Sequence, residues 1–134
     1  MRATPEECFH LSIETVVKIH AEAISKFGGL GGVRDENLLA SAVLAPQSTF
    51  GGESPYHDLV EIAAAYLFYI CKNHPFIDGN KRIGLAATIA FLGLNDRWLE
   101  SDPDELLEVV LRVARGEIGK PEIAVFLRER CVDF

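Results

Sequence analysis

A nine-residue polar segment between two apolar segments most constrains the fold of this chain. It runs from His74 to Arg82 with the sequence His-Pro-Phe-Ile-Asp-Gly-Asn-Lys-Arg. The segment before it, Leu59 to Cys71, is apolar on nearly every side, which is typical of a helix that is buried all round. The segment after it, Lys81 to Leu94, is also mainly apolar. The sequence therefore predicts a polar loop between two buried helices.

The ends of this loop carry clear helix signals. The residue before a proline is disfavoured in the α conformation, so Pro75 predicts that His74 lies at the helix exit with its ring free to face a cleft. Gly79 tolerates a positive φ, and Asn80 is a favourable N-cap for a helix over about Lys81 to Leu94. We therefore expect the loop to end on a helix N-terminus.

The residue types in this loop suit phosphate chemistry. Free N–H groups of a helix N-terminus, together with Lys81 and Arg82, indicate an anion site. His74 can accept a proton from an attacking hydroxyl. Asp78 offers the hard oxygen that Mg²⁺ prefers, and one carboxylate suffices when phosphates and water complete the shell. Each feature alone is common in turns, but their order in one loop favours catalysis.

Periodicity and capping residues predict further helices. These are expected at 12–27 with Ser12 as N-cap, from Asp35 to about Ala45, from Asp102 to about Arg115, and at 121–130. A short separate turn is expected at residues 4–7. His20 shares a helix face with apolar residues, so we interpret it as packed rather than as a ligand. The glycine cluster 28–32 follows a helix and lacks the dinucleotide-binding order, which indicates a C-cap and turn.

Residues 47–57 form the longest stretch without helical periodicity. Thr49 and Phe50 favour a strand, and Gly51 and Gly52 favour a turn, so a small hairpin is compatible with this segment. Trp98 is expected to close the core in the link after the second apolar helix. The sequence predicts an all-α fold in which residues 1–134 form one compact helical bundle.

Composition narrows the classes of partner. The net charge of −7 disfavours direct binding to nucleic acid or to an anionic membrane. The 3 cysteines are widely spaced, which favours neither a disulfide framework nor a zinc site. We find no signal peptide and no apolar run of membrane-spanning length, and we therefore expect a cytoplasmic protein.

The polar segment resembles the Fic/Doc (Fido) motif, H-x-F-x-[D/E]-G-N-[G/K]-R. The matching positions are His74, Phe76, Asp78, Gly79, Asn80, Lys81 and Arg82. Resemblance to the death-on-curing (Doc) branch extends through Ile19-His20, Phe27 to Gly29, Val33 to Leu39 and Pro46 to Gly52. The likeness covers most of the chain and implies a Fic/Doc-type helical bundle.

Two positions bear on the reaction. Fic-type AMP transferases have a glycine where this chain has Lys81, and a second arginine where it has Leu85. Doc-type proteins share the lysine and lack that arginine, and they transfer the γ-phosphate of ATP. The resemblance therefore implies a Mg²⁺-dependent protein Ser/Thr kinase, with AMP transfer as the alternative.

The resemblance also assigns roles to residues. His74 is the expected base, and Asp78 is expected to hold Mg²⁺ or to place the hydroxyl. The backbone amides of Gly79 and Asn80, together with the side chain of Asn80, are expected to bind phosphate oxygens of ATP. The remaining roles are charge neutralisation by Lys81 and Arg82 and anchoring of the loop in the core by Phe76.

In the family, a flap beside the active site binds the target as an added strand. The resemblance places this target-docking flap at Thr49, Phe50, Gly51 and Gly52. It further implies a bacterial toxin that phosphorylates elongation factor Tu and inhibits translation. Its cognate antitoxin would supply a disordered segment that folds onto the toxin. A non-catalytic module that binds an antitoxin is the other alternative.

Overall fold

Helices make up most of the structure, a computed structural model that describes residues 3–133. The helices are α1 (Ile13–Phe27), α2 (Glu36–Leu44), α3 (Leu59–Asn73), α4 (Asn80–Leu94), α5 (Pro103–Ala114) and α6 (Lys120–Arg130). A 3-10 turn, η1 (Ala45–Gln47), follows α2, and the short strands β1 (Arg97–Leu99) and β2 (Cys131–Asp133) flank the last two helices. The predicted all-α class is confirmed.

Short polar side chains define where several helices begin. Ser12 accepts a hydrogen bond from the N–H of Thr15 and so starts α1. Asp35, Asp58 and Asp102 do the same for α2, α3 and α5. These contacts satisfy N–H groups that have no partner inside the helix. Because a cap is a local interaction, the sequence located these helix starts to within a residue or two.

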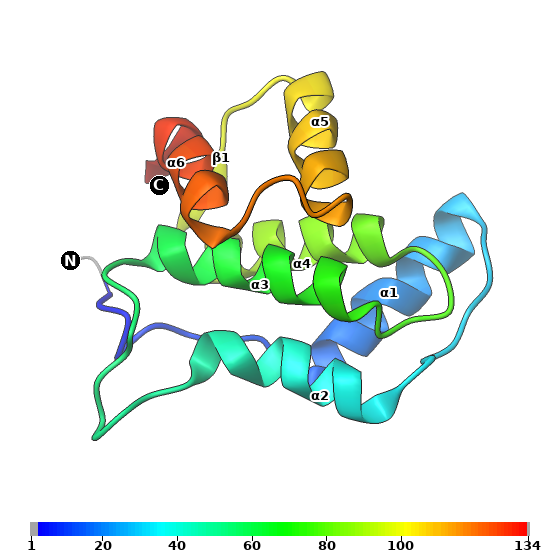
Figure 1. The fold of residues 1–134 in the computed structure, drawn as a ribbon, viewed down its shortest axis with the longest axis horizontal. Coiled ribbons are helices and arrows are strands. Elements are labelled where there is room, and N and C mark those ends of the chain that lie inside the picture. Colours follow the sequence, from blue (N-terminus) through cyan, green and yellow to red (C-terminus); the bar gives the residue numbers. More distant parts are fainter. Residues whose placement is uncertain (1–2, 134) are drawn as a thin grey trace.

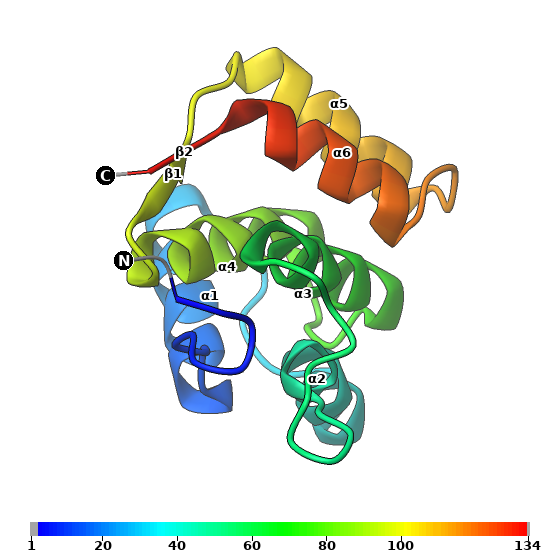
Figure 2. The ribbon, with the colours of Figure 1, turned by 90° about the vertical axis from the view of Figure 1, so that its left-hand side faces the viewer.

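The helices form three layers (Figures 1 and 2). The central layer consists of α3 and α4, which lie side by side and are joined by the polar loop. One face of this pair is covered by α5 and α6, and the other by α1 and α2. Ten of the 15 residues of α3 are buried, because helices cover it on both sides. The polar loop is therefore tied to the most buried part of the molecule.

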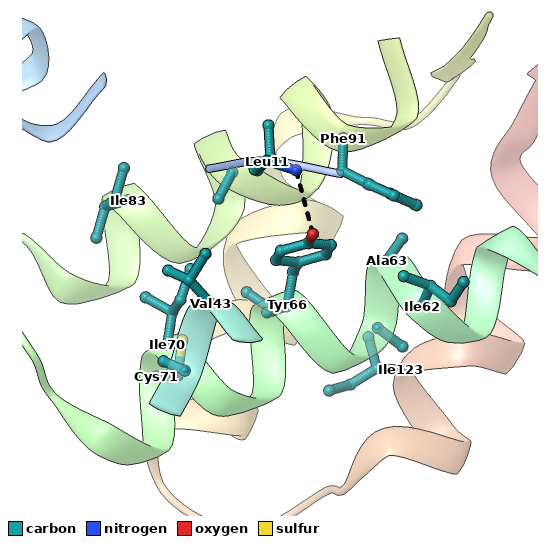
Figure 3. Packing of buried hydrophobic residues seen from close by; sticks show 14 of the residues in the cluster. Leu11, Val43, Ile62, Ala63, Tyr66, Ile70, Cys71, Ile83, Phe91 and Ile123 are labelled. Atoms are coloured by element: carbon teal, nitrogen blue, oxygen red, sulfur yellow. Dashed lines mark hydrogen bonds between the residues drawn. The ribbon is translucent and has the colours of Figure 1, made fainter. Parts of the chain in front are cut away.

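Tyr66, on α3, is a polar group at the centre of this core (Figure 3). Its side chain is fully buried, and its hydroxyl accepts a hydrogen bond of 3.3 Å from the N–H of Leu11. The same hydroxyl lies 2.9 Å from Nδ1 of His10. Burial raises the pKa of Tyr66, so the hydroxyl stays protonated and can donate to His10. These bonds attach the segment that precedes α1 to the central layer.

The two strands are a feature that the sequence did not predict. β1 pairs antiparallel with β2, with Trp98 opposite Val132. Trp98 was expected in a link between helices, and it lies in a strand instead. The strands are only three residues long each, and they lie far apart in the sequence, so periodicity could not reveal the pairing.

The segment 47–57 contains a tight turn in place of a regular hairpin. Phe50 and Glu53 form one isolated antiparallel bridge around Gly51 and Gly52, whose φ values are 59° and 83°. This turn precedes the N-terminus of α3, at the lower left of Figure 1. None of the helices in the described part of the chain is long and apolar enough to cross a membrane.

We expect Tyr66→Phe to lower the free energy of unfolding by about 1–3 kcal/mol, because the buried N–H of Leu11 loses its acceptor. Urea unfolding followed by circular dichroism measures this change. Tyr56→Phe is the control, since the Tyr56 hydroxyl is only partly buried and its contact with Lys120 is 3.5 Å long. An equal loss in both variants would contradict the structural role of Tyr66.

Candidate active site

His74 is the C-cap of α3 and adopts a left-handed backbone conformation, with φ 48° and ψ 56°. For a residue with a Cβ, this conformation is unfavourable by on the order of 1–2 kcal/mol. Pro75 disfavours the α conformation at the residue before it and so prevents α3 from continuing. The predicted position of His74 at the helix exit is confirmed. The left-handed turn also reverses the chain toward α4.

Asn80 shapes the loop from within. Its Oδ1 accepts from the N–H of Phe76 at 3.0 Å, and its Nδ2 donates to the carbonyl of Phe76 at 2.9 Å. Asn80 was expected to be the N-cap of α4, but the N-cap is Gly79 and Asn80 is the first helical residue. The reason is that the Asn80 amide bonds to the loop backbone rather than to the helix amides. Its expected contact with phosphate thus competes with a structural role.

The Asn80 amide also touches His74. Its Nδ2 lies 3.3 Å from Nδ1 of His74. The two bonds to Phe76 fix the orientation of the amide, so its nitrogen donates and Nδ1 of His74 accepts. In the neutral ring the proton is then on Nε2. The loop therefore selects one tautomer of the candidate base.

The middle of the loop is attached to α1. Phe76 is 1% exposed and stacks on the ring of His20, with 3.8 Å between the ring centroids. Nε2 of His20 donates to the carbonyl of Asp78 at 2.7 Å. His20 is thus packed and hydrogen-bonded, as its place in the sequence predicted. It also supports the loop that bears the candidate site, which its position in α1 did not reveal.

Asp78 carries an exposed carboxylate that the backbone holds on both oxygens. Oδ2 accepts from the N–H of Leu30 at 3.1 Å, and Oδ1 accepts from the N–H of Gly79 at 2.8 Å. These two N–H groups, helped by the charge of Arg82, hold the pKa of Asp78 below its usual range. Each oxygen keeps a further lone pair. Asp78 is therefore an ionised oxygen ligand in a fixed orientation.

The glycine cluster brings Leu30 to Asp78 in an irregular segment, residues 28–34. Even-numbered residues of this segment contact the loop: Gly28 accepts from Arg82, Leu30 donates to Asp78, Gly32 accepts from Ile77 and Arg34 donates to Pro75. The contacts include one isolated antiparallel bridge, between Val33 and Phe76, and the segment is not a regular strand. The predicted C-cap and turn at this cluster is confirmed at Gly28. The contact with the loop was missed, because the two segments are far apart in the sequence.

The loop opens on a cleft of about 430 Å³ that is lined by His74, residues 77–82 and Leu107. Lys81 and Arg82 are exposed here, and the first turn of α4 contains no acidic residue. In the described part of the chain, no residue accepts a hydrogen bond from the backbone N–H of Asn80, Lys81 or Arg82. Free N–H groups and two cations at a helix N-terminus make this cleft suited to an anion.

A second cleft, of about 620 Å³, also includes His74 and runs along residues 113–119. Cys71 contributes to its wall, but burial raises the pKa of this thiol to about 11. Cys71 is therefore protonated near neutral pH and is a poor nucleophile. His74 is a residue that the two clefts share.

Two further observations concern the expected nucleotide and metal. Leu85, which replaces the second arginine of Fic-type proteins, packs against the core and offers no charge. The described residues contain no group of three or more potential metal ligands. A Mg²⁺ ion fits the donor set only as a ligand of Asp78, with substrate phosphates and water as its other ligands.

The structure does not bring Thr49, Phe50, Gly51 and Gly52 to this site. They precede α3, whereas His74 follows it, and a helix of 15 residues is about 22 Å long. Figure 1 shows the turn and the loop between α3 and α4 at opposite ends of the bundle. The sequence indicated a turn at 49–52 but contained no information on its distance from the motif. Residues 28–34 lie beside the motif instead.

Comparison with known proteins shows the family of the chain. The sequence profile of the Fic/DOC family matches residues 10–92. The chain is 33% identical over 119 residues to "Protein kinase doc" of Escherichia phage P1, which covers 89% of this chain and 93% of that protein. It is 45% identical over 78 residues to "Toxin Doc" of Mycolicibacterium smegmatis, covering 58% of this chain and 60% of that protein. The chain therefore belongs to the Fic/DOC family, and within it to the Doc branch.

Gly29→Ala tests how the glycine segment positions Asp78. Gly29 has φ 116°, and a Cβ atom there would lie 2.7 Å from Oδ2 of Asp78. We expect a loss of about 1–3 kcal/mol in the free energy of unfolding and a rise in the pKa of Asp78 toward its usual range. Urea unfolding and an NMR titration of the carboxyl carbon measure the two effects. The stability difference should narrow as the pH falls and Asp78 becomes protonated in both proteins.

Gly31→Ala is the matched control for this experiment. Gly31 lies in the same segment and lacks a positive φ, and a Cβ atom there would have no neighbouring atom within 4 Å. The substitution should leave the free energy of unfolding and the pKa of Asp78 unchanged. If Gly29→Ala also left the pKa of Asp78 unchanged, the bond from Leu30 would not be what orients the carboxylate.

Proposed function

We propose that this chain is a Doc-type toxin that transfers the γ-phosphate of ATP to a Ser or Thr hydroxyl of a protein. The observation that carries the proposal is the cleft at the start of α4, where His74, an ionised Asp78 and the cations Lys81 and Arg82 surround free helix amides. Phosphoryl transfer depends mainly on positioning and on neutralisation of charge, and this cleft supplies both. The relative named as a protein kinase covers nearly the whole chain.

Each residue of the cleft has its own role in the proposed reaction. The backbone N–H groups of Asn80 to Arg82, with the side chains of Lys81 and Arg82, bind and neutralise the phosphates of ATP. Asp78 would hold Mg²⁺, and the bound ion would offset the charge of the phosphates. His74 accepts the proton of the attacking hydroxyl. Gly79 gives the chain the left-handed turn that exposes the helix amides, with φ 77°.

His74 must change its contacts to act as a base. While Nδ1 accepts from Asn80, the proton of the neutral ring is on Nε2. Release from Asn80 frees Nδ1, or lets the ring exchange tautomers and free Nε2. The contact of 3.3 Å is close to the upper limit for a hydrogen bond and is easily opened. A phosphate oxygen that takes over the Asn80 N–H would couple nucleotide binding to activation of His74.

The target docks along residues 29–33 in this proposal. In the described structure, no backbone hydrogen bond is made by Gly29, Gly31 or Val33, so their N–H and carbonyl groups are available to an added chain. Leu30, in the same segment, is 67% exposed. Backbone pairing would hold a target with little demand on its sequence and would bring a hydroxyl to His74. The segment 49–52 is too distant for this role.

The cellular role follows from the branch of the family. We propose that the chain is a bacterial cytoplasmic toxin that inhibits translation by phosphorylating elongation factor Tu, and that a cognate antitoxin restrains it by folding a disordered segment onto its surface. Relatives named as Doc support this role. AMP transfer is the weaker alternative, because Lys81 and the partly buried Leu85 replace the glycine and arginine of Fic-type proteins.

ATP labelled at the γ- or the α-phosphate distinguishes these reactions. With Mg²⁺ and a bacterial extract that contains elongation factor Tu, we expect protein label from the γ position only. His74→Ala should reduce transfer by about 100-fold or more, because the base is lost. His57→Ala is the control, since His57 is 89% exposed at the other end of α3. Label from the α position would establish AMP transfer, and label from neither would favour a non-catalytic binding module.

Alanine substitutions at two apolar residues of similar exposure test the proposed docking segment. Leu30 is 67% exposed beside the motif, and Phe50 is 72% exposed in the distant turn. We expect Leu30→Ala to raise KM for the protein substrate about tenfold, which corresponds to the burial of one apolar side chain. Phe50→Ala should leave KM unchanged. If Phe50→Ala raised KM more than Leu30→Ala did, residues 49–52 would be the docking site instead.

A further inference from the structure

Arg34 contacts three successive carbonyls at the point where α3 gives way to the loop. Its Nε donates to the carbonyl of His74 at 2.7 Å, and its Nη2 donates to the carbonyl of Asn73 at 2.9 Å. Its backbone N–H donates to the carbonyl of Pro75 at 2.7 Å. No other side chain in the described structure bonds to two consecutive carbonyls of this turn.

The two guanidinium bonds act on the two backbone torsions of His74. The Asn73 carbonyl belongs to the peptide unit before the His74 Cα, and its orientation follows φ of His74. The His74 carbonyl belongs to the peptide unit after that Cα, and its orientation follows ψ. A planar guanidinium that binds both therefore fixes both torsions at once. The direction of the His74 side chain is set by the same Cα.

A role in helix capping alone does not account for this geometry. The Asn73 carbonyl is at the end of α3, where a cation is favourable. The carbonyls of His74 and Pro75 lie beyond the helix and add nothing to its hydrogen bonds. His74 is one of two described residues other than glycine with a positive φ, and such a conformation persists only where surrounding contacts enforce it.

We infer that Arg34 is a positioning residue that holds the backbone of His74 in its left-handed conformation and so directs the imidazole at the cleft. The inference rests on the proposed role of His74 as the base. Arg34 does not line the cleft around the α4 N-terminus, so it acts through His74 and leaves phosphate binding to Lys81 and Arg82.

Steady-state kinetics of Arg34→Ala test the consequence for transfer. We expect kcat to fall about 10- to 100-fold, as is typical of a misplaced catalytic group, while KM for ATP is unchanged. Arg34→Lys should lose nearly as much, because the single nitrogen of lysine cannot replace the rigid fork of Nε and Nη2 that reaches the two carbonyls. Added methylguanidinium should restore part of the activity of Arg34→Ala and none of that of Arg34→Lys.

Arg128→Ala is the matched control. Arg128, on α6, bonds to Asp58, the N-cap at the opposite end of α3. Its removal should alter stability without altering kcat. Wild-type activity in Arg34→Lys would show that charge at the helix end suffices, and would overturn the inference. The inference would also be overturned if the activity of Arg34→Ala fell only in proportion to its folded fraction and methylguanidinium did not restore it.

Amide hydrogen exchange separates this inference from the proposed function. In Arg34→Ala and Arg34→Lys, the amides of His74 and Asp35, which donate to Ile70 and Pro75, should exchange about tenfold faster or more. The amide of Ile83, which donates to Gly79 in the first turn of α4, should not change. Unchanged exchange at His74 would refute the inference even in an active enzyme. Faster exchange in a protein without transferase activity would support the positioning and refute the function.

Discussion

The loop between α3 and α4 lies outside the helices, so its backbone carbonyls need partners from other segments, and three side chains supply several of them. Asn80 donates to Phe76, His20 donates to Asp78, and Arg34 donates to His74. Each of these bonds joins the loop to a different part of the chain: the start of α4, the middle of α1 and the segment before α2. The loop therefore takes its shape from all the elements that surround it.

This arrangement explains why a charged site can lie on so apolar a pair of helices. The burial of α3 and α4 fixes the two ends of the loop, and Phe76 fixes its middle by packing on His20. The protein carries a net charge of −7, yet the first turn of α4 holds Lys81 and Arg82 and no acid. Asp78 stays ionised beside them because backbone N–H groups bond to both of its oxygens. The result suits a phosphate together with a divalent cation, whose reaction depends on exact placement.

Local signals explain how much of the fold was predictable. Caps such as Ser12 and Asp35 placed the helix starts, and Pro75 placed the exit of α3, because these interactions involve residues close in the sequence. The pairing of β1 with β2 escaped detection, since strands of three residues carry too little periodicity. Asn80 was misassigned as an N-cap because its amide could bond to either the helix or the loop, and the fold of the loop decided which.

The sequence by itself determined the residue types of the site and the two buried helices that frame it, because both depend on side-chain chemistry and local spacing. Only the tertiary structure decided which segment lies beside the site. It placed the glycine segment against Asp78 and the turn at 49–52 at the far end of α3. Contacts between segments tens of residues apart depend on how helices pack, and packing is set by the shape of the whole core.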